Sequence, residues 1–264
     1  MPDRGQHPQR DHKSVVREEF TRQAAAYAAA AVITNEERLG RLVTAIKPRP
    51  SDRALEVATG PGYVAFALGA RCGEVVGLDL TDAPLQIAER NRRERAVANL
   101  RFETGDAENL SFGDGGFDIA VCRFAFHHFE DPSRVLAEMC RVCRPGGTVA
   151  IEDLYLSEIP ERARYANHIE RLRDPSHTRA LALSEFMQMF ARAGIEIQRL
   201  YSDELASDLE SWLQTTQTRS GEAAEVHQLL RDDMEKDLSG MRPFFHEGRL
   251  HFFQRTIAII GRKL

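Results

Sequence analysis

Three carboxylates follow apolar segments of the chain, each at the point where a predicted strand ends. Glu56 lies at the end of the first segment, Asp79 ends a second apolar run, and Asp106 follows a third. The carboxyl ends of parallel strands meet at one edge of an open α/β sheet, where such folds bind ligands. Three acids around one cleft favour a ligand that has a cationic centre and an ammonium group.

A glycine-rich turn lies next to the first of these acids, and its pattern fits two classes of nucleotide site. The pattern G-x-G-x-x-A that begins at Gly60 matches the dinucleotide fingerprint, and Asp79 lies near the spacing of its ribose-binding acid, about 20 residues on. Three features oppose a pyrophosphate here. Pro61 removes a backbone N–H donor, and Glu56 and Asp106 add negative charge. The turn therefore favours a cationic, phosphate-free cofactor over a nicotinamide dinucleotide.

Alternating strands and helices are expected to position these residues. Apolar runs that end at turn-forming residues predict strands, and the helices between them begin with capping residues or prolines. Four βα units in succession indicate an α/β fold: a Rossmann-like, doubly wound, mostly parallel sheet of seven strands with the last one antiparallel. The predicted strands are 54–57, 74–79, 100–104, 117–122, 148–152, 195–201 and 250–260.

The chain divides into four predicted regions. Residues 1–13 are polar and predicted to be disordered, and residues 14–50 form an N-terminal helical cap. Residues 51–155 form the ligand-binding core. Residues 156–264 supply lid helices and complete the sheet. The helices predicted outside the core are 14–31, 35–46, 158–173, 184–193 and 205–240.

The 264-residue chain has the composition of an ordinary soluble globular protein, with 42% hydrophobic and 28% charged residues. A net charge of −5 gives no reason to expect nucleic acid or an anionic membrane as partner. No window approaches the run of about 20 apolar residues that a membrane span needs, and there is no signal-peptide core. Four cysteines do not indicate a disulfide framework. We therefore expect a cytoplasmic monomer or homodimer that acts on a small molecule.

Five stretches of the sequence together resemble the class I S-adenosylmethionine-dependent methyltransferases. More narrowly, they resemble the branch that contains the ubiquinone/menaquinone C-methyltransferases and related small-molecule enzymes. As a set, in this order and spacing, the motifs are highly specific, and the resemblance covers residues 14–200 well. The stretches are LEVATGPGYVA (55–65), VVGLDLT (75–81), GDAENLSF (105–112), FDIAVCRFAFHHFEDP (117–132) and RPGGTVAIED (144–153).

The resemblance implies a role for each cofactor-binding position. The glycine turn would lie against the methionine part of S-adenosylmethionine, with Glu56 beneath it. Asp79 would accept both ribose hydroxyls and Asp106 the adenine amine. Backbone near Cys122 and Arg123 would bind the ammonium end. The residues expected to bind the cofactor are Gln23, Tyr27, Glu56, Ala58, Gly60, Gly62, Asp79, Leu80, Asp106, Ala107, Cys122 and Arg123.

Two of these positions need comment. The family's common first glycine is Ala58 in this chain, and alanine is the smallest alternative. Glu56 has a second interpretation, as a structural carboxylate that caps a nearby helix.

His127 and His128 are candidate catalytic residues. They follow the fourth predicted strand, where the acceptor pocket should begin. A histidine that titrates near neutral pH can take a proton from a hydroxyl, an amine or an activated carbon. The alternative is that one of them holds the loop in place. No metal site is expected, because Cys140 and Cys143 lack a second pair for zinc and are predicted to lie in the core.

The sequence thus predicts an S-adenosylmethionine-dependent methyltransferase that methylates a small molecule by in-line SN2 transfer, with a histidine as candidate general base. Two alternatives stay open. One is a member of the fold that binds the cofactor in a non-methylating role, such as a cyclisation. The other, less favoured, is an NAD-dependent oxidoreductase. The acceptor atom (O, N, C or S) is not indicated.

Overall fold

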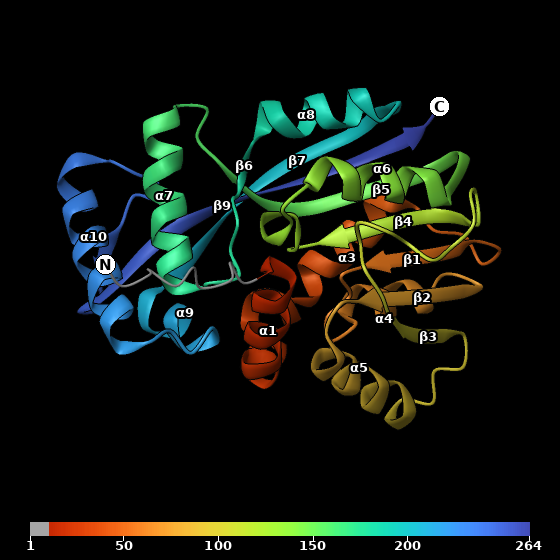
Figure 1. Cartoon of the computed structure of the whole chain (residues 1–264), viewed down its shortest axis with the longest axis horizontal. Helices are drawn as coiled ribbons and strands as arrows, with labels where there is room; N and C mark the ends of the chain where they lie inside the picture. The colour runs from red at the N-terminus through yellow and green to blue at the C-terminus, as the bar shows by residue number, and fades with distance from the viewer. Residues whose placement is uncertain (1–10) are drawn as a thin grey trace, which may run out of the picture.

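The computed structural model describes residues 11–264, in which one mixed sheet is covered by helices on both faces (Figure 1). The strands are β1 Arg53–Val57, β2 Glu74–Asp79, β3 Leu100–Thr104, β4 Phe117–Arg123, β5 Cys143–Leu156, β6 Leu181–Ala182, β7 Ile195–Asp208, β8 Phe244–His246 and β9 Arg249–Lys263.

The order of neighbouring strands is β3-β2-β1-β4-β5-β9-β7, with β6 beside β5 and β8 beside β9. Strands β1 to β5 pair in parallel, whereas β9 is antiparallel to both β5 and β7. The order reverses between β1 and β4, which makes this the point where an open α/β sheet binds its ligand. The predicted doubly wound, mostly parallel sheet with an antiparallel last strand is confirmed.

Helices cover the two faces of the sheet in separate groups (Figure 1). Alternate residues of β1 point to opposite faces: Leu55 and Val57 belong to the core under α6 and α8, and Ala54 to the core under α3 and α4. The helices are α1 His12–Ala29, α2 Ala31–Thr34, α3 Glu36–Ile46, α4 Tyr63–Gly69, α5 Asp82–Glu94, the 3-10 turn η1 Phe126–His128, α6 Pro132–Val142, α7 Pro160–Arg173, α8 Leu183–Arg192, α9 Leu209–Thr215 and α10 Ser220–Lys236.

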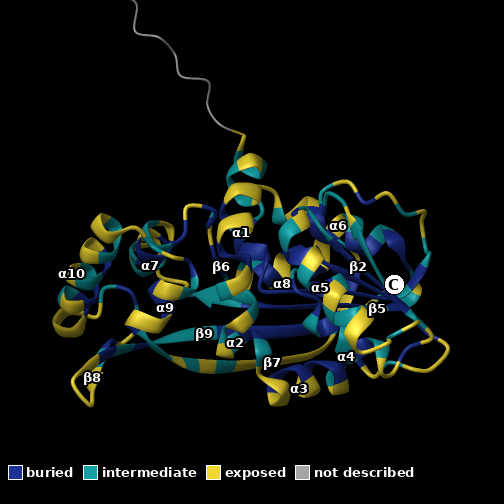
Figure 2. Cartoon of the chain, turned by 90° about the horizontal axis from the view of Figure 1, so that it is seen from below, coloured by how far each residue is buried: buried dark blue, intermediate teal, exposed yellow. Residues whose placement is uncertain are grey.

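A third, smaller core lies at one end of the molecule, where α7, α9 and α10 gather around the ends of β7 and β9 (Figures 1 and 2). Its buried side chains include Trp212, Leu230 and Phe252. Helix α1 lies between this end and the parallel part of the sheet in both views. We call α7, α9 and α10 the lid helices. Helix α8 belongs to the predicted lid region but packs on the sheet, since Phe186 and Phe190 are part of the core between the sheet and α6.

The structure corrects two of the predicted boundaries. Helix α1 begins at His12, so His12 and Lys13 are helical rather than part of a disordered tail; residues 1–10 of that predicted tail lie outside the described residues. The segment 205–208 was predicted to be helical but continues β7, which pairs with β9 as far as Asp208. Polar and half-buried residues alternate there with the period of a strand, and this period outweighs the charged composition.

None of the helices in the part of the chain that the structure describes is both long and apolar enough to cross a membrane.

Candidate functional site

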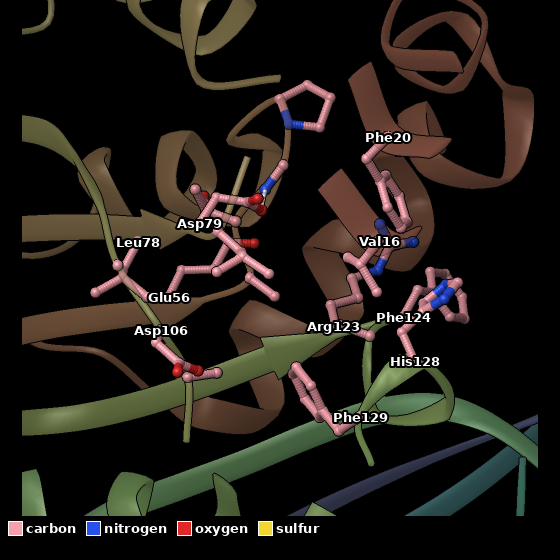
Figure 3. A pocket seen from close by; sticks show the side chains of 18 of the residues that line it. Val16, Phe20, Glu56, Leu78, Asp79, Asp106, Arg123, Phe124, His128 and Phe129 are labelled. Atoms are coloured by element: carbon pink, nitrogen blue, oxygen red, sulfur yellow. Dashed lines mark hydrogen bonds between the residues drawn. The ribbon is translucent and has the colours of Figure 1, made fainter. Parts of the chain in front are cut away.

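A cavity of about 960 Å³ opens at the carboxyl ends of β1 to β4, beneath α1. We call it the cofactor cavity. Figure 3 shows Glu56, Asp79 and Asp106 on one side of it, with Phe20 and His128 on the other. The three acids therefore converge, as the sequence predicts. Among the predicted site residues, its lining contains Tyr27, Glu56, Ala58, Gly60, Asp79, Leu80, Asp106, Ala107, Arg123 and His128.

Four predicted site residues do not line this cavity: Gln23, Gly62, Cys122 and His127. Cys122 is fully buried in the core of the sheet. Gly62 starts α4 at φ +85°, and a Cβ on it would come within 2.7 Å of the Phe102 ring. Gln23 is buried; its Nε2 makes a long contact of 3.5 Å with Asp174, and its Oε1 has no partner among residues 11–264. The assignment of Gln23, Gly62 and Cys122 to the cofactor, and of His127 to catalysis, stays a prediction.

Glu56 holds the glycine turn against α4. One of its oxygens accepts the Thr59 hydroxyl at 2.5 Å and the Ala65 N–H, in the first turn of α4, at 2.7 Å. Burial raises the pKa of Glu56 to about 8, although these two donors act in the opposite direction. The helix-capping interpretation and the loop-organising role implied by the family thus describe one set of contacts.

Asp79 accepts two backbone N–H groups, from Gly60 at 2.8 Å and from Thr81 at 2.9 Å. Burial raises the pKa of Asp79 to about 6, against the effect of these donors. The carboxylate thereby connects the end of β2 to the glycine turn at the end of β1. Because Asp79 also binds the Gly60 N–H, a ligand that donates to Asp79 binds a carboxylate whose position depends on the conformation of the turn.

Asp106 is engaged by a residue that sequence reasoning missed. Lys13 of α1 donates to Asp106 and to Glu108, both at 2.7 Å. Asp106 also accepts the Glu108 N–H at 3.0 Å. Helix α1 is thus fastened across the cofactor cavity at the carboxylate that the family assigns to adenine. No pattern in the sequence pointed to Lys13, because it lies among the charged residues expected to be disordered.

The glycine turn adopts conformations that favour small residues. Ala58 has φ +54° and Gly60 φ +51°, both in the left-handed region. A Cβ on Gly60 would point across the cavity to within 3.9 Å of Tyr27. The turn therefore leaves space between β1 and α1 that a side chain would fill. The wall of the cavity beside this space carries the three carboxylates. This combination fits a cationic ligand with hydroxyl groups, such as S-adenosylmethionine, and the residues present are compatible with it.

Arg123 lines the cavity but is already bound to protein. Its guanidinium donates to Glu152 at 3.0 Å and to the carbonyl oxygens of Val32 and Ile33, both at 3.1 Å. Arg38 of α3 donates to the other oxygen of Glu152 at 2.7 Å. The buried Glu152 thus ties the cap formed by α2 and α3 to the end of β4. The side chain of Arg123 positions the cap.

The two candidate catalytic histidines have different environments. His127 Nδ1 lies 2.5 Å from Asp153 Oδ1; burial acts to lower the pKa of His127, but the Asp153 charge outweighs it and the pKa is raised. His128 Nδ1 lies 3.0 Å from the carbonyl oxygen of Ser176. Burial, with the nearby His127 charge, lowers the pKa of His128 to about 4. His127 is thus bound to Asp153, whereas His128, with its lowered pKa, is a neutral imidazole at neutral pH.

A second chamber of about 590 Å³ adjoins the cofactor cavity. Five residues line both spaces, and His128 is one of them. The shared residues are Phe20, Tyr27, Ile33, Phe124 and His128. The remaining lining residues of the second chamber are Val32, His127, Leu154, Arg173, Asp174, Leu205, Trp212, Thr215, Thr216 and Gln254.

Across residues 11–264, no cluster of three or more His, Cys, Asp or Glu side chains could hold a metal ion. Cys72, Cys122, Cys140 and Cys143 are free and buried, which for Cys140 and Cys143 agrees with the predicted core position.

Comparison with known proteins places this site in a family. A family model described as a methyltransferase domain matches residues 55–151. The uncharacterized methyltransferase YcgJ of Bacillus subtilis is 34% identical over 194 residues, which are 74% of this chain and 77% of that protein. The crystal structure of YcgJ has a TM-score of 0.83 at 30% identity and covers 87% of this chain and 99% of that chain.

The chain belongs to the class I S-adenosylmethionine-dependent methyltransferases.

Within this family, the methyltransferase resembles the ubiquinone/menaquinone branch in its core. A demethylmenaquinone methyltransferase of Deinococcus radiodurans is 40% identical over 101 residues, which are 38% of this chain and 42% of that protein. The fold also occurs in the [4+2]-cyclase SpnF, with a TM-score of 0.60, 18% identity and coverage of 86% of this chain and 80% of that chain. A likeness at that identity shows the fold alone.

Sequence reasoning missed several residues around the histidines of this methyltransferase. Asp153, which pairs with His127, follows the fifth strand's Glu152, and the rule applied to the first three strand ends would have found it. Asp174 and Ser176 lie beyond α7, and Phe20 lies on α1. These three are brought to the site by packing between segments far apart in the chain.

Proposed function

We propose that this protein transfers the methyl group of S-adenosylmethionine to a small-molecule acceptor, and that His128 takes the proton which the acceptor loses. One observation carries the proposal: His128 lies where the cofactor cavity meets the second chamber, and its Nδ1 is committed to a backbone carbonyl. A carbonyl oxygen accepts, so Nδ1 carries the hydrogen and Nε2 keeps its lone pair.

The cofactor supplies an electrophilic methyl group on a positively charged sulfur. The acceptor atom forms a bond to the methyl carbon, and the electrons of the breaking carbon–sulfur bond stay on sulfur, which becomes neutral. The acceptor proton moves to His128 Nε2. One positive charge is lost at sulfur and one is gained at the imidazole, so the net charge of the enclosed site does not change.

A set of contacts would stabilise the protonated form of His128. The Ser176 hydroxyl lies 3.1 Å from His128 Nδ1 and donates to Asp174 at 2.5 Å. Asp174 also accepts the Ser176 N–H at 2.9 Å. Asp174 therefore orients the segment that holds His128, and its charge raises the pKa of that histidine against burial. Asp174 and Ser176 are positioning residues in this scheme.

His127 has a structural role in the proposal. Its ring is bound to Asp153, and its backbone carbonyl oxygen accepts the N–H groups of Thr178 and Arg179. Asp153 in turn accepts the Phe126 N–H at 2.6 Å. These contacts hold η1 in place, so that His128 is presented to both spaces. His127 does not line the cofactor cavity.

The first experiment tests cofactor choice by calorimetric titration with S-adenosylmethionine, S-adenosylhomocysteine and NADH. We expect binding of both adenosylated ligands and none of NADH. Tight binding of NADH without a response to the other two would contradict the proposal. Family membership and the three acids of the cofactor cavity support the expected result.

The second experiment tests the base. Phenols and 1,3-dicarbonyl compounds are offered with S-adenosylmethionine, and S-adenosylhomocysteine formation is measured. With any accepted compound, His128→Gln should lower kcat by about 10²- to 10⁴-fold while cofactor affinity stays within a few-fold. His168→Gln is the matched control, because His168 is an exposed lid histidine beside Glu225. An unchanged kcat in His128→Gln would remove the base from the mechanism. Cofactor binding without turnover of any acceptor would favour the non-methylating alternative.

A further inference from the structure

The second chamber is built by the N-terminal cap and the lid end of the molecule. Most of its lining lies outside residues 55–151, the part matched by the methyltransferase family model. Its walls come from α1, α2, the ends of β4 and β5, α7, β7, α9 and β9. The family's shared core therefore does not determine the shape of this space.

Aromatic and aliphatic side chains make up much of this lining. Trp212 is 7% exposed and packs edge-on against Phe252, with ring centres 4.7 Å apart at 71°. At the opening to the cofactor cavity, Phe124 has φ +52°, an unusual backbone conformation for a bulky residue. Such strain persists when the surroundings hold it, and it clusters at ligand sites. Two rigid aromatic surfaces thus lie at different places along one space.

Each charged group in the chamber wall already has a partner within the protein. Arg173 lies over the Trp212 ring at 4.6 Å, donates to the Trp212 carbonyl oxygen at 3.2 Å and lies 3.8 Å from Glu170. Asp174 is bound by Ser176, and His127 by Asp153. A charged ligand would lose its hydration without meeting an uncompensated counter-charge, which is unfavourable.

We infer that the second chamber binds the methyl acceptor and that this acceptor is an uncharged, flat, largely apolar molecule. The inference rests on the proposed methyl transfer. The flat part would pack against Trp212, and the atom to be methylated would lie at the opening between Phe124 and His128. Aromatic contact and burial of apolar surface supply the affinity. The proton and the electron pair move as described above, with His128 Nε2 as the proton acceptor.

Trp212 offers a direct test, because the chain contains one tryptophan and it lines the chamber. Tryptophan fluorescence is measured with S-adenosylhomocysteine bound while three quenchers of the same ring are added: 4-nitrobenzyl alcohol, 4-nitrobenzoate and 4-nitrobenzylammonium. We expect saturable quenching by the neutral alcohol at an affinity at least about tenfold above that of either ion. Quenching that does not saturate, equal affinities, or preference for an ion would overturn the inference.

A charge change in the chamber wall gives a second readout. Leu205 lines the chamber from β7, so Leu205→Arg should shift the preference toward 4-nitrobenzoate. Leu200→Arg is the matched control on the same strand, because Leu200 is 41% exposed and does not line the chamber. Thr215→Arg, on α9, makes the same test if Leu205→Arg does not melt cooperatively. An unchanged preference in a folded chamber variant would show that the probes bind elsewhere.

The quenching assay involves no turnover, so its failure and the failure of methyl transfer are distinguishable. Suppose that the neutral probe binds saturably and selectively but no S-adenosylhomocysteine forms from S-adenosylmethionine. This result would support the proposed chamber and contradict the proposed methyl transfer. Methyl transfer to an acceptor that leaves Trp212 fluorescence unchanged would support the proposed function and contradict the inference that the acceptor binds in the second chamber.

Discussion

The cofactor cavity and the second chamber lie side by side but recognise ligands by different means. Acids at the ends of β1, β2 and β3 form one wall of the cofactor cavity, where Asp79 and Glu56 also hold the glycine turn. The second chamber is lined by aromatic and aliphatic residues together with polar ones, and its charged lining residues Arg173 and His127 lie beside Glu170 and Asp153. Carboxylates at the ends of three strands thus distinguish the first space, and the Trp212 ring with its paired charged neighbours distinguishes the second.

This difference teaches where each kind of specificity is encoded. Each acid of the cofactor cavity sits in a short motif at a strand end, so one stretch of sequence carries both the residue and its position. Trp212, Leu205 and Gln254 meet in the second chamber through packing of α9, β7 and β9. The acids of the cofactor cavity can therefore be predicted from local sequence, whereas the second chamber, our proposed acceptor site, is formed only by tertiary packing.

The largest effect on ligand binding is expected from Asp79→Asn, which removes one carboxylate charge from the wall of the cofactor cavity. The amide cannot accept both the Gly60 and Thr81 N–H groups and a ligand's hydroxyls in the same way, so affinity for S-adenosylmethionine should fall at least about 100-fold. Calorimetry measures this. Asp82→Asn is the matched control, since Asp82 lies at the start of α5 and does not line the cofactor cavity. An affinity within threefold of the parent would count against the ribose role of Asp79.

A smaller effect, of about tenfold in kcat, is expected from Asp174→Asn at the boundary between the two spaces. The charge of Asp174 raises the pKa of His128, so its removal should lower that pKa further. Activity requires neutral His128. In the parent protein, kcat should therefore fall on the acid side of its pH profile as the pH drops toward about 4. In Asp174→Asn this fall should move to lower pH. A purely structural role would reduce kcat without moving it.

Binding of a cationic ligand in the cofactor cavity should release protons. Burial raises the pKa of Glu56 to about 8 and that of Asp79 to about 6, so near pH 6 Glu56 is largely and Asp79 partly protonated, and a cationic ligand would expel these protons. Affinity for S-adenosylmethionine should therefore rise by up to about tenfold from pH 6 to pH 8, with proton release seen by calorimetry in buffers of different ionisation enthalpy. Adenosine, which keeps the ribose but carries no cation, is the control and should show a smaller rise of affinity with pH. Equal pH dependence of the two ligands would contradict the charge-based account.

The smallest effect is expected from Lys13→Met, which unfastens α1 from Asp106 and Glu108. These groups are partly exposed, so loss of the contacts should speed S-adenosylhomocysteine dissociation by only about two- to fivefold in stopped-flow fluorescence. Lys236→Met, at the end of α10, is the control for a lost surface charge. Tighter cofactor binding in Lys13→Met would show instead that Lys13 competes with the adenine amine for Asp106.

The sequence predicted the fold and the acid side of the site because both depend on short patterns. Strand ends located Glu56, Asp79 and Asp106, and prolines and capping residues located the helices of the core. It missed the continuation of β7 to Asp208, where exposed charges hid the strand period. It also placed Lys13 in a disordered tail, since the partners that make it part of the site, Asp106 and Glu108, are far away in the chain.

The histidine pair shows the same limit at closer range. Adjacent identical residues in one motif gave no basis for choosing between them. The choice comes from Asp153 on β5 and Ser176 beyond α7, which bind His127 and His128 respectively. Only the packed structure separates His127, which is anchored to Asp153, from His128, which lines both spaces.

The most direct test of the account is a crystal structure with S-adenosylhomocysteine, in which the distance from the ligand sulfur to His128 Nε2 is measured. We predict that the ribose contacts Asp79 and that the sulfur faces the opening shared with the second chamber. It should lie within about 8 Å of Nε2, which leaves room for one methyl group and one acceptor atom. A sulfur that faces away from this opening, with Nε2 bound to another protein group, would contradict the claim that His128 serves the transfer.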